Sequence, residues 1–156
     1  RLADPTGPQG EHYADEGFLA TLVKGVREAP MTPEDFSTLI KEKAFSVQSD
    51  EETVAKLHKT FAETVLGSME TGSYHKIKWE PRQLKSMGAA LRLCHKLKSL
   101  ALGGCGMNET GLAAFASALQ ANAAPALETL VLSDNELDGD QGWKALGEAL
   151  QRGALP

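Results

Sequence analysis

Two groups of residues have the types and spacing that could carry chemistry, and both point to metals. Asp134, Glu136, Asp138 and Asp140 alternate along one short segment, as oxygen ligands do in a calcium-binding loop. The twelfth position of such a loop needs a bidentate acid, and in this chain it is Ala145. A solvated loop that brings acidic side chains to the start of a helix is therefore the favoured interpretation.

The second group is Cys94, His95 and Cys105, which lacks the second close pair of ligands typical of a structural zinc site. No serine, cysteine or lysine lies in a nucleophile motif, and the glycine-rich stretch 103–106 lacks the context of a phosphate-binding loop. We therefore expect no catalytic, metal or cofactor site, and we expect that the protein is not an enzyme.

Composition and charge exclude further classes. Residues 1–73 hold 13 acidic and 7 basic side chains, and residues 74–156 hold 8 and 9. Neither half concentrates Lys and Arg as nucleic-acid binding requires. The uncharged stretch 110–127 is built on alanine and contains Pro125, which favours an amphipathic helix over a membrane span. Two cysteines are too few for a disulfide scaffold and favour an intracellular location, cytoplasmic or organellar.

The N-terminal half has the patterns of three helices after an extended polar segment, 1–14. The first helix is predicted over 15–29, where large apolar residues share one face before Pro30. Thr32 and Pro33 then provide a cap and a first helical position for the second helix. The apolar residues of the first helix are Phe18, Leu19, Leu22, Val23 and Val26.

The third helix is predicted to begin at Ser49 and to end at Gly67. Ser49 and Glu52 have the spacing of a capping box, in which each side chain satisfies an exposed backbone donor of the other. The residues expected to form its apolar stripe are Val54, Leu57, Phe61 and Val65. The region 15–73 is therefore predicted to be helical and to cap the remainder of the chain.

From Tyr74 onward the sequence repeats itself. Two copies of a leucine pattern lie thirty residues apart, and each precedes a helical segment. The positions of the second copy are Leu97, Leu100, Leu102, Cys105 and Met107, and those of the third are Leu127, Leu130, Leu132, Asn135 and Leu137. A weaker first copy places Tyr74, Ile77, Trp79, Arg82 and Leu84 in the same positions. The pattern predicts a short strand with its leucines inward, a turn tied down by the Asn or Cys, and a helix outside.

These residues resemble the leucine-rich repeat family, and in particular the ribonuclease-inhibitor-like subtype. The segment from Leu127 to Leu150, LETLVLSDNELDGDQGWKALGEAL, carries the resemblance most clearly. The resemblance implies an α/β fold, a short solenoid of three strand–helix repeats with parallel strands over 74–96, 97–126 and 127–156. No polar capping segment follows the third repeat, so we expect further repeats or another molecule to cover that end.

Members of the family usually bind proteins on the concave strand face, so the resemblance implies a non-catalytic protein-interaction module. The alternative is a structural or accessory subunit of a larger assembly, or a regulatory fragment of a longer protein. The residues expected to line the binding face are His75, Lys76, Lys78, Lys98, Ser99, Glu128, Thr129 and Val131. Trp143, at the start of the last predicted helix, is a candidate anchor for a partner.

Overall fold

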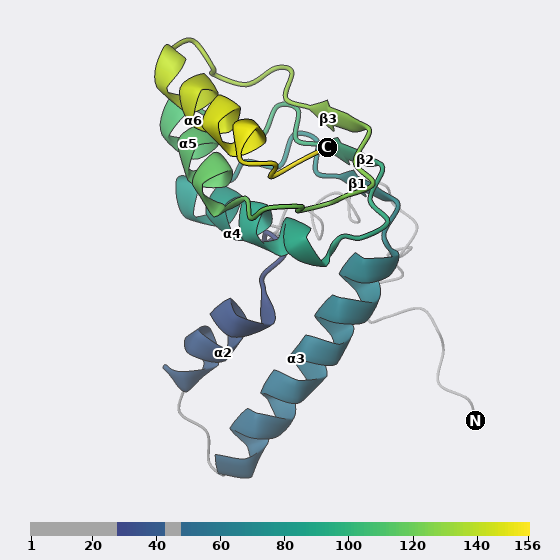
Figure 1. Cartoon of the computed structure of the whole chain (residues 1–156). Coiled ribbons are helices and arrows are strands. Elements are labelled where there is room, and N and C mark those ends of the chain that lie inside the picture. Colours follow the sequence, from purple (N-terminus) through teal and green to yellow (C-terminus); the bar gives the residue numbers. More distant parts are fainter. Residues whose placement is uncertain (1–27, 43–47) are drawn as a thin grey trace, which may run out of the picture.

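The computed structural model describes residues 28–42 and 48–156, which form a small parallel sheet with helices packed against it (Figure 1). The elements are α2 (Pro33–Lys41), α3 (Gln48–Ser68), β1 (Thr71–Ser73), α4 (Pro81–Ala90), the 3-10 helix η1 (Leu91–Leu93), β2 (Ser99–Ala101), α5 (Glu109–Ala118), β3 (Thr129–Val131) and α6 (Asp140–Gln151). The predicted segment 1–14 and most of the predicted helix 15–29 lie outside the described residues. Glu28 and Ala29 are described and are not helical.

The sheet contains three strands in the order β1-β2-β3, and both pairings are parallel. Parallel neighbours need a crossover connection, which α4 with η1 supplies between β1 and β2, and α5 between β2 and β3. Leu100 pairs with Gly72 on one side and with Leu130 on the other. The prediction of an α/β protein with parallel strands is confirmed.

Backbone hydrogen bonds between neighbouring chain segments continue beyond each short strand. The N–H of Tyr74 donates to the carbonyl of Ala101 at 2.9 Å, and the N–H of Lys76 donates to Gly103 at 2.9 Å. One unit further on, the N–H of Gly104 donates to Ser133, also at 2.9 Å. The turns after the strands are therefore stacked in register like the strands themselves.

The side chains of Asn135 and Cys105 fix these turns. The Asn135 amide donates to the carbonyls of Leu102 and Leu132 at 2.8 and 2.9 Å, and its oxygen accepts from the N–H of Met107 at 3.1 Å. The Cys105 thiol donates to the carbonyl of Tyr74 at 3.0 Å. Each side chain thus satisfies backbone groups of the preceding unit, as the sequence pattern predicted.

The position of the first strand was predicted wrongly. The comparison of the repeats placed Tyr74 in the position of Leu97. In the structure β1 ends at Ser73, and Gly72 pairs with Leu100, which lies 28 residues later in the chain. Gly72 is buried where the other units have leucine, and a Cβ added to it would lie 3.1 Å from Leu100 Cδ1. Arg82 belongs to α4 and not to the turn, so it does not occupy the position of Asn135.

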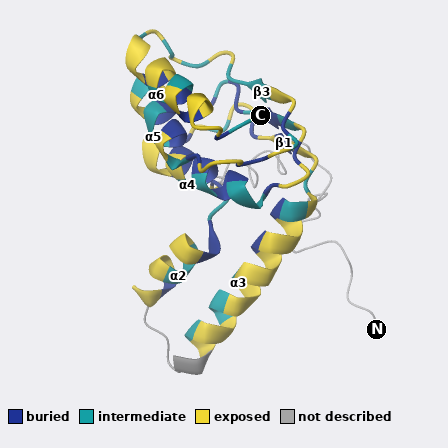
Figure 2. Cartoon of the chain, viewed as in Figure 1, coloured by how far each residue is buried: buried dark blue, intermediate teal, exposed yellow. Residues whose placement is uncertain are grey.

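One apolar core lies between the sheet and the helices α4, α5 and α6 (Figure 2). Apolar side chains from the strands, the turns and the helices fill it, and among them Leu100, Leu102 and Phe115 are fully buried. α4 packs against α5 closely, because Gly88 lacks a side chain: a Cβ there would lie 2.4 Å from the carbonyl oxygen of Phe115. The helices follow one another in a single layer, α4 then α5 then α6.

α2 and α3 lie side by side and extend away from this layer (Figure 1). The predicted start of α2 is confirmed, since Thr32 Oγ1 accepts from the N–H of Asp35 at 3.1 Å and Pro33 is the first helical residue. α3 begins one residue before the predicted Ser49, whose side chain is outside the described residues, and it ends one residue after Gly67. Its C-terminal residues Ala62 and Leu66 join the core.

Replacing Asn135 by Ala should destabilise the fold, because three backbone groups of two successive turns lose their partner at once. We expect a loss of about 1–3 kcal/mol in the free energy of unfolding, measured by urea denaturation. Ser133→Ala, which changes an exposed side chain in the same turn, is the matched control and should have little effect. Equal stability of the two variants would contradict the role assigned to Asn135.

Gly88 and Gly147 provide a second, paired prediction for helix packing. Gly88→Ala pushes a methyl group into α5 and should destabilise by about 1–3 kcal/mol. Gly147 has no atom within 4 Å of an added Cβ, so Gly147→Ala should instead stabilise the isolated chain by about 0.5–1 kcal/mol through helix propensity alone. Thermal unfolding in dilute solution compares the two, and a shift of the same sign in both would contradict the packing described here.

Candidate functional site

The outward face of the sheet carries small polar side chains in regular rows. The register places Thr71, Ser99 and Thr129 in one row. Ser73, Ala101 and Val131 form the next row. We call these six residues the sheet face, together with Glu70, Lys98 and Glu128, which immediately precede them on the three strands. No side chain of the sheet face is buried, whereas the residues that alternate with them in β2 point into the core.

The charges on the sheet face alternate in sign across the strands. Lys98 Nζ lies 3.4 Å from Glu70 Oε2, and both side chains are more than half exposed. Glu128 follows on the third strand, where its N–H donates to the carbonyl of Lys98. An exposed pair of this kind adds little stability, so these charges contribute little to holding the strands together and remain accessible on the surface.

Three residues predicted to line this face lie elsewhere. His75, Lys76 and Lys78 follow β1 and belong to the turn at its carboxyl end, because Tyr74 and not Trp79 takes the core position opposite Leu102. Five other predicted residues are on the sheet face: Lys98, Ser99, Glu128, Thr129 and Val131. Sequence reasoning missed Glu70, Thr71 and Ser73, because the glycine at position 72 hid the first strand from the leucine pattern.

The turns beyond the carboxyl ends of the strands carry a gradient of charge. The turn after β1 is basic, with exposed His75, Lys76 and Lys78. The turn after β2 is glycine-rich and uncharged. The turn after β3 is acidic, with exposed Asp134, Glu136 and Asp138. A gradient from basic to acidic side chains therefore runs along the turns from the first unit to the third.

The two cysteines are buried and free. Burial raises the pKa of the Cys94 thiol to about 11, and it raises that of Cys105 while the N–H of Ile77 opposes the shift. Cys94 donates to the carbonyl of Ala90 at 3.6 Å. Both thiols are therefore protonated at neutral pH and act as packed side chains. Among the described residues, no three His, Cys, Asp or Glu side chains are grouped closely enough to hold a metal ion.

A second surface is the apolar groove between α2 and α3, with a volume of about 440 Å³. Phe36 and Leu39 of α2 line one side and Phe61 and Val65 of α3 the other, and Tyr74 also contributes to the lining. The sequence pattern predicted that Leu57, Phe61 and Val65 would face a core, but they are 65%, 64% and 42% exposed. α3 instead buries Ala62 and Leu66, which lie on the neighbouring face.

His58 lies in this groove and stacks on Phe36 with ring centroids 3.8 Å apart and an angle of 7° between the planes. Its Nδ1 is buried and has no hydrogen-bond partner among the described atoms. Desolvation lowers the pKa of His58 below its ordinary value. The contact between α2 and α3 therefore favours the neutral imidazole.

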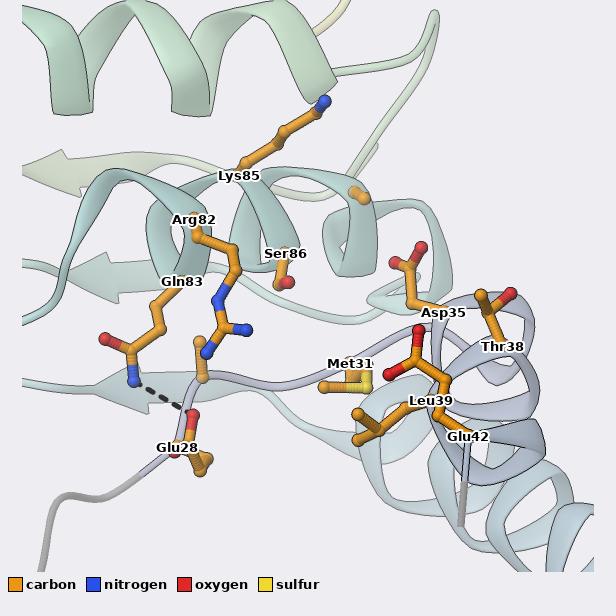
Figure 3. A pocket seen from close by; sticks show the side chains of 12 residues that line it. Glu28, Met31, Asp35, Thr38, Leu39, Glu42, Arg82, Gln83, Lys85 and Ser86 are labelled. Carbon is orange, nitrogen blue, oxygen red and sulfur yellow. Dashed lines mark hydrogen bonds between the residues drawn. The ribbon is translucent and has the colours of Figure 1, made fainter.

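A third hollow, of about 640 Å³, separates α2 from α4 and is drawn in Figure 3. Gln83 Nε2 of α4 donates to Glu28 Oε2 at 2.9 Å across one end. Arg92 forms an ion pair with Glu34, which joins α2 to η1. Polar and charged side chains line the hollow together with the apolar Met31 and Leu39. The two links tie α2 and the segment before it to α4 and η1.

Trp143, the predicted anchor, lies on α6 and is 46% exposed. Its Nε1 donates a long hydrogen bond of 3.5 Å to the carbonyl of Leu137. The indole N–H is therefore directed to the turn after β3, and much of the ring is exposed to solvent.

In the part of the chain that the structure describes, no helix combines the length and the apolar character needed to cross a bilayer. Comparisons of the chain with protein-family models, with curated proteins and with solved structures gave no match.

The stack of His58 on Phe36 predicts a pH dependence. Because the pKa of His58 is lower in the folded state than in the unfolded state, its stabilising effect is complete above about 6.5 and is lost as the pH falls through the folded-state pKa. His58→Phe keeps an aromatic stack and removes the titration. Urea denaturation between pH 7.5 and pH 5 should therefore show a steeper fall of the free energy of unfolding with pH in the parent than in the variant. An equal pH dependence in the two proteins would contradict the assigned role of His58.

Proposed function

We propose that this protein is a non-catalytic protein-interaction module built from three leucine-rich repeats of the ribonuclease-inhibitor-like type. Three features support the repeat assignment. The strands are separated by 28 and 30 residues, each strand is followed by a helix, and the turns are tied by Cys105 and Asn135 at equivalent positions. These ties place a hydrogen-bonding side chain at the same distance after β2 and after β3, which is the characteristic feature of this repeat pattern.

The observation that carries the binding proposal is the sheet face, on which six exposed and three partly exposed side chains form ordered rows. The backbone beneath them is held by the ladder and by the turn ties, so a partner meets a preorganised surface. Small residues predominate there, among them Thr71, Ser99 and Ala101. A partner can therefore approach the strands closely and project its own large side chains onto them.

The three strands alone span only about 10 Å, which is less than a standard protein interface requires. We therefore infer that a partner also contacts the charged turns at the carboxyl ends of the strands. Lys76 and Lys78 at one end of this row of turns and Asp134 and Asp138 at the other would orient a partner with the opposite polarity.

A second candidate is an accessory subunit of a larger assembly. The observation that favours it is the exposed apolar row Leu57, Phe61 and Val65 on α3, with Leu39 of α2 across the groove. Apolar side chains gathered on one exposed surface are typical of interaction sites. In this arrangement α2 and α3 would bind the assembly, and the repeats would hold them in place.

Site-specific photocrosslinking separates the two candidates. A benzoylphenylalanine at position 99 or 129 tests the sheet face, at position 61 the groove, and at position 110 the exposed start of α5 as control. We expect one protein to be crosslinked from positions 99 and 129 and not from 110. With that protein purified, Ser99→Arg with Thr129→Arg should weaken binding by at least about tenfold, or about 1.4 kcal/mol, while Thr110→Arg should not. Crosslinking from position 61 alone would support the second candidate and contradict the first.

A further inference from the structure

α6 exposes a face that α4 and α5 bury. Gly88 of α4 faces the next helix in the layer, since a Cβ there would meet Phe115 and Ala118 of α5. The residue equivalent to Gly88 in α5 is Ala116, which is fully buried. The equivalent residue in α6 is Gly147, where an added Cβ would have no atom within 4 Å. The surface that receives the next helix is therefore present on α6 and is open.

The residues on either side of Gly147 are also exposed, whereas their equivalents in α4 and α5 are buried. Leu84 and Leu112, which contact the following helix at Gly111 and Gly142, are 1% and 0% exposed. Trp143 occupies their position in α6 and is 46% exposed. At the other flank, Leu91 and Leu119 are 0% and 5% exposed, whereas the equivalent Leu150 is 44% exposed.

The open face continues from α6 onto the sheet. Leu100 and Leu102 are fully buried beneath the next unit, whereas the equivalent Leu130 and Leu132 are only partly buried. The N–H of Thr129 donates to Lys98 and the carbonyl of Val131 accepts from Leu102, so both residues direct their backbone groups to β2. Alternation along the strand then directs the backbone groups of Leu130 away from the sheet.

We propose that this surface, formed by α6 and the outer edge of β3, binds a second copy of the same chain. A two-fold axis perpendicular to the sheet would make the two β3 strands and the two α6 helices antiparallel. Leu130 of each copy would then exchange both backbone hydrogen bonds with Leu130 of the other. The proposal is independent of the function assigned to the sheet face, because the two surfaces do not share their defining residues.

The side chains of α6 suit a copy of themselves in this orientation. With Gly147 at the crossing point, Trp143 of one copy lies beside Leu150 of the other, because they stand four residues before and three residues after the glycine. The glycines let the two helices approach closely, as Gly88 does for α4 and α5. Aromatic and leucine side chains thus fill the space on both sides of the contact.

The charges on α6 are complementary in the same arrangement. Lys144 lies three residues before Gly147 and Glu148 lies one residue after it, and both are exposed. Neither takes part in an ion pair within the described parts of the chain. In the antiparallel pair, Lys144 of each copy lies within one helical turn of Glu148 of the other. A parallel pair would instead bring like charges together.

Sedimentation velocity over a range of chain concentrations tests the proposal. One helix face and one strand edge form a small interface, so we expect reversible dimerisation with a dissociation constant in the micromolar range. Gly147→Glu should weaken the dimer by at least about tenfold without unfolding the chain, since the added side chain meets open space. Ser117→Glu, which adds the same charge on the exposed surface of α5, is the control and should dimerise like the parent.

Charge reversal tests the antiparallel arrangement directly. Lys144→Glu and Glu148→Lys should each weaken self-association, because each places like charges opposite one another. An equimolar mixture of the two variants should form a mixed dimer more tightly than either variant alone. A parent chain that remains monomeric at high concentration, or a mixture that associates no better than the separate variants, would overturn the proposal, and neither result would bear on partner binding by the sheet face.

Discussion

The hydrogen bonds that tie each turn to the one before it are the constraint on which the rest of the structure depends. A strand of three residues cannot by itself fix the direction in which the chain leaves the sheet. Asn135 does so by bonding Leu102 and Met107, and Cys105 does so by bonding Tyr74. Because the turns are fixed, the following helices begin at equivalent places and can pack as a layer. The rows of the sheet face follow from the same register.

The sequence predicted these ties where leucine and Asn or Cys occur together, and it failed where other residues fill the same space. Gly72 is opposite Leu100, whose side chain closes the gap that a leucine would fill. Because the leucine pattern requires a large apolar residue at this position, the sequence prediction assigned Tyr74 and Ile77 to the strand. It therefore also placed His75, Lys76 and Lys78 on the strand, whereas these residues follow it. The spacing of residues in the sequence identifies a repeat, but the side chains of the neighbouring strand determine which residue types fit at each position of the repeat.

α3 illustrates a different limit of sequence reasoning. The spacing of its apolar residues correctly predicted a helix. The helical period alone does not determine which of two adjacent faces packs against the core. The small Ala62 and the neighbouring Leu66 allow the helix to approach the core, and the larger Leu57 and Phe61 are left outside. The row of large apolar residues at helical spacing is therefore exposed on the surface of α3. Because α2 lies beside this row, the two helices form the groove that contains His58.

Stacking also determines which apolar surface the described units leave open. Each unit buries its apolar face against the next one, so the open face of α6 is costly to expose to water and is the surface that we propose binds a second copy. The choice of residue at that face is consistent with this dual character. Where α4 and α5 have Leu84 and Leu112, α6 has Trp143, whose N–H remains bonded to Leu137 while the ring offers a large area to a partner. A leucine there would give up a smaller apolar area to a partner and would lack a polar group to fix its position while the face is open.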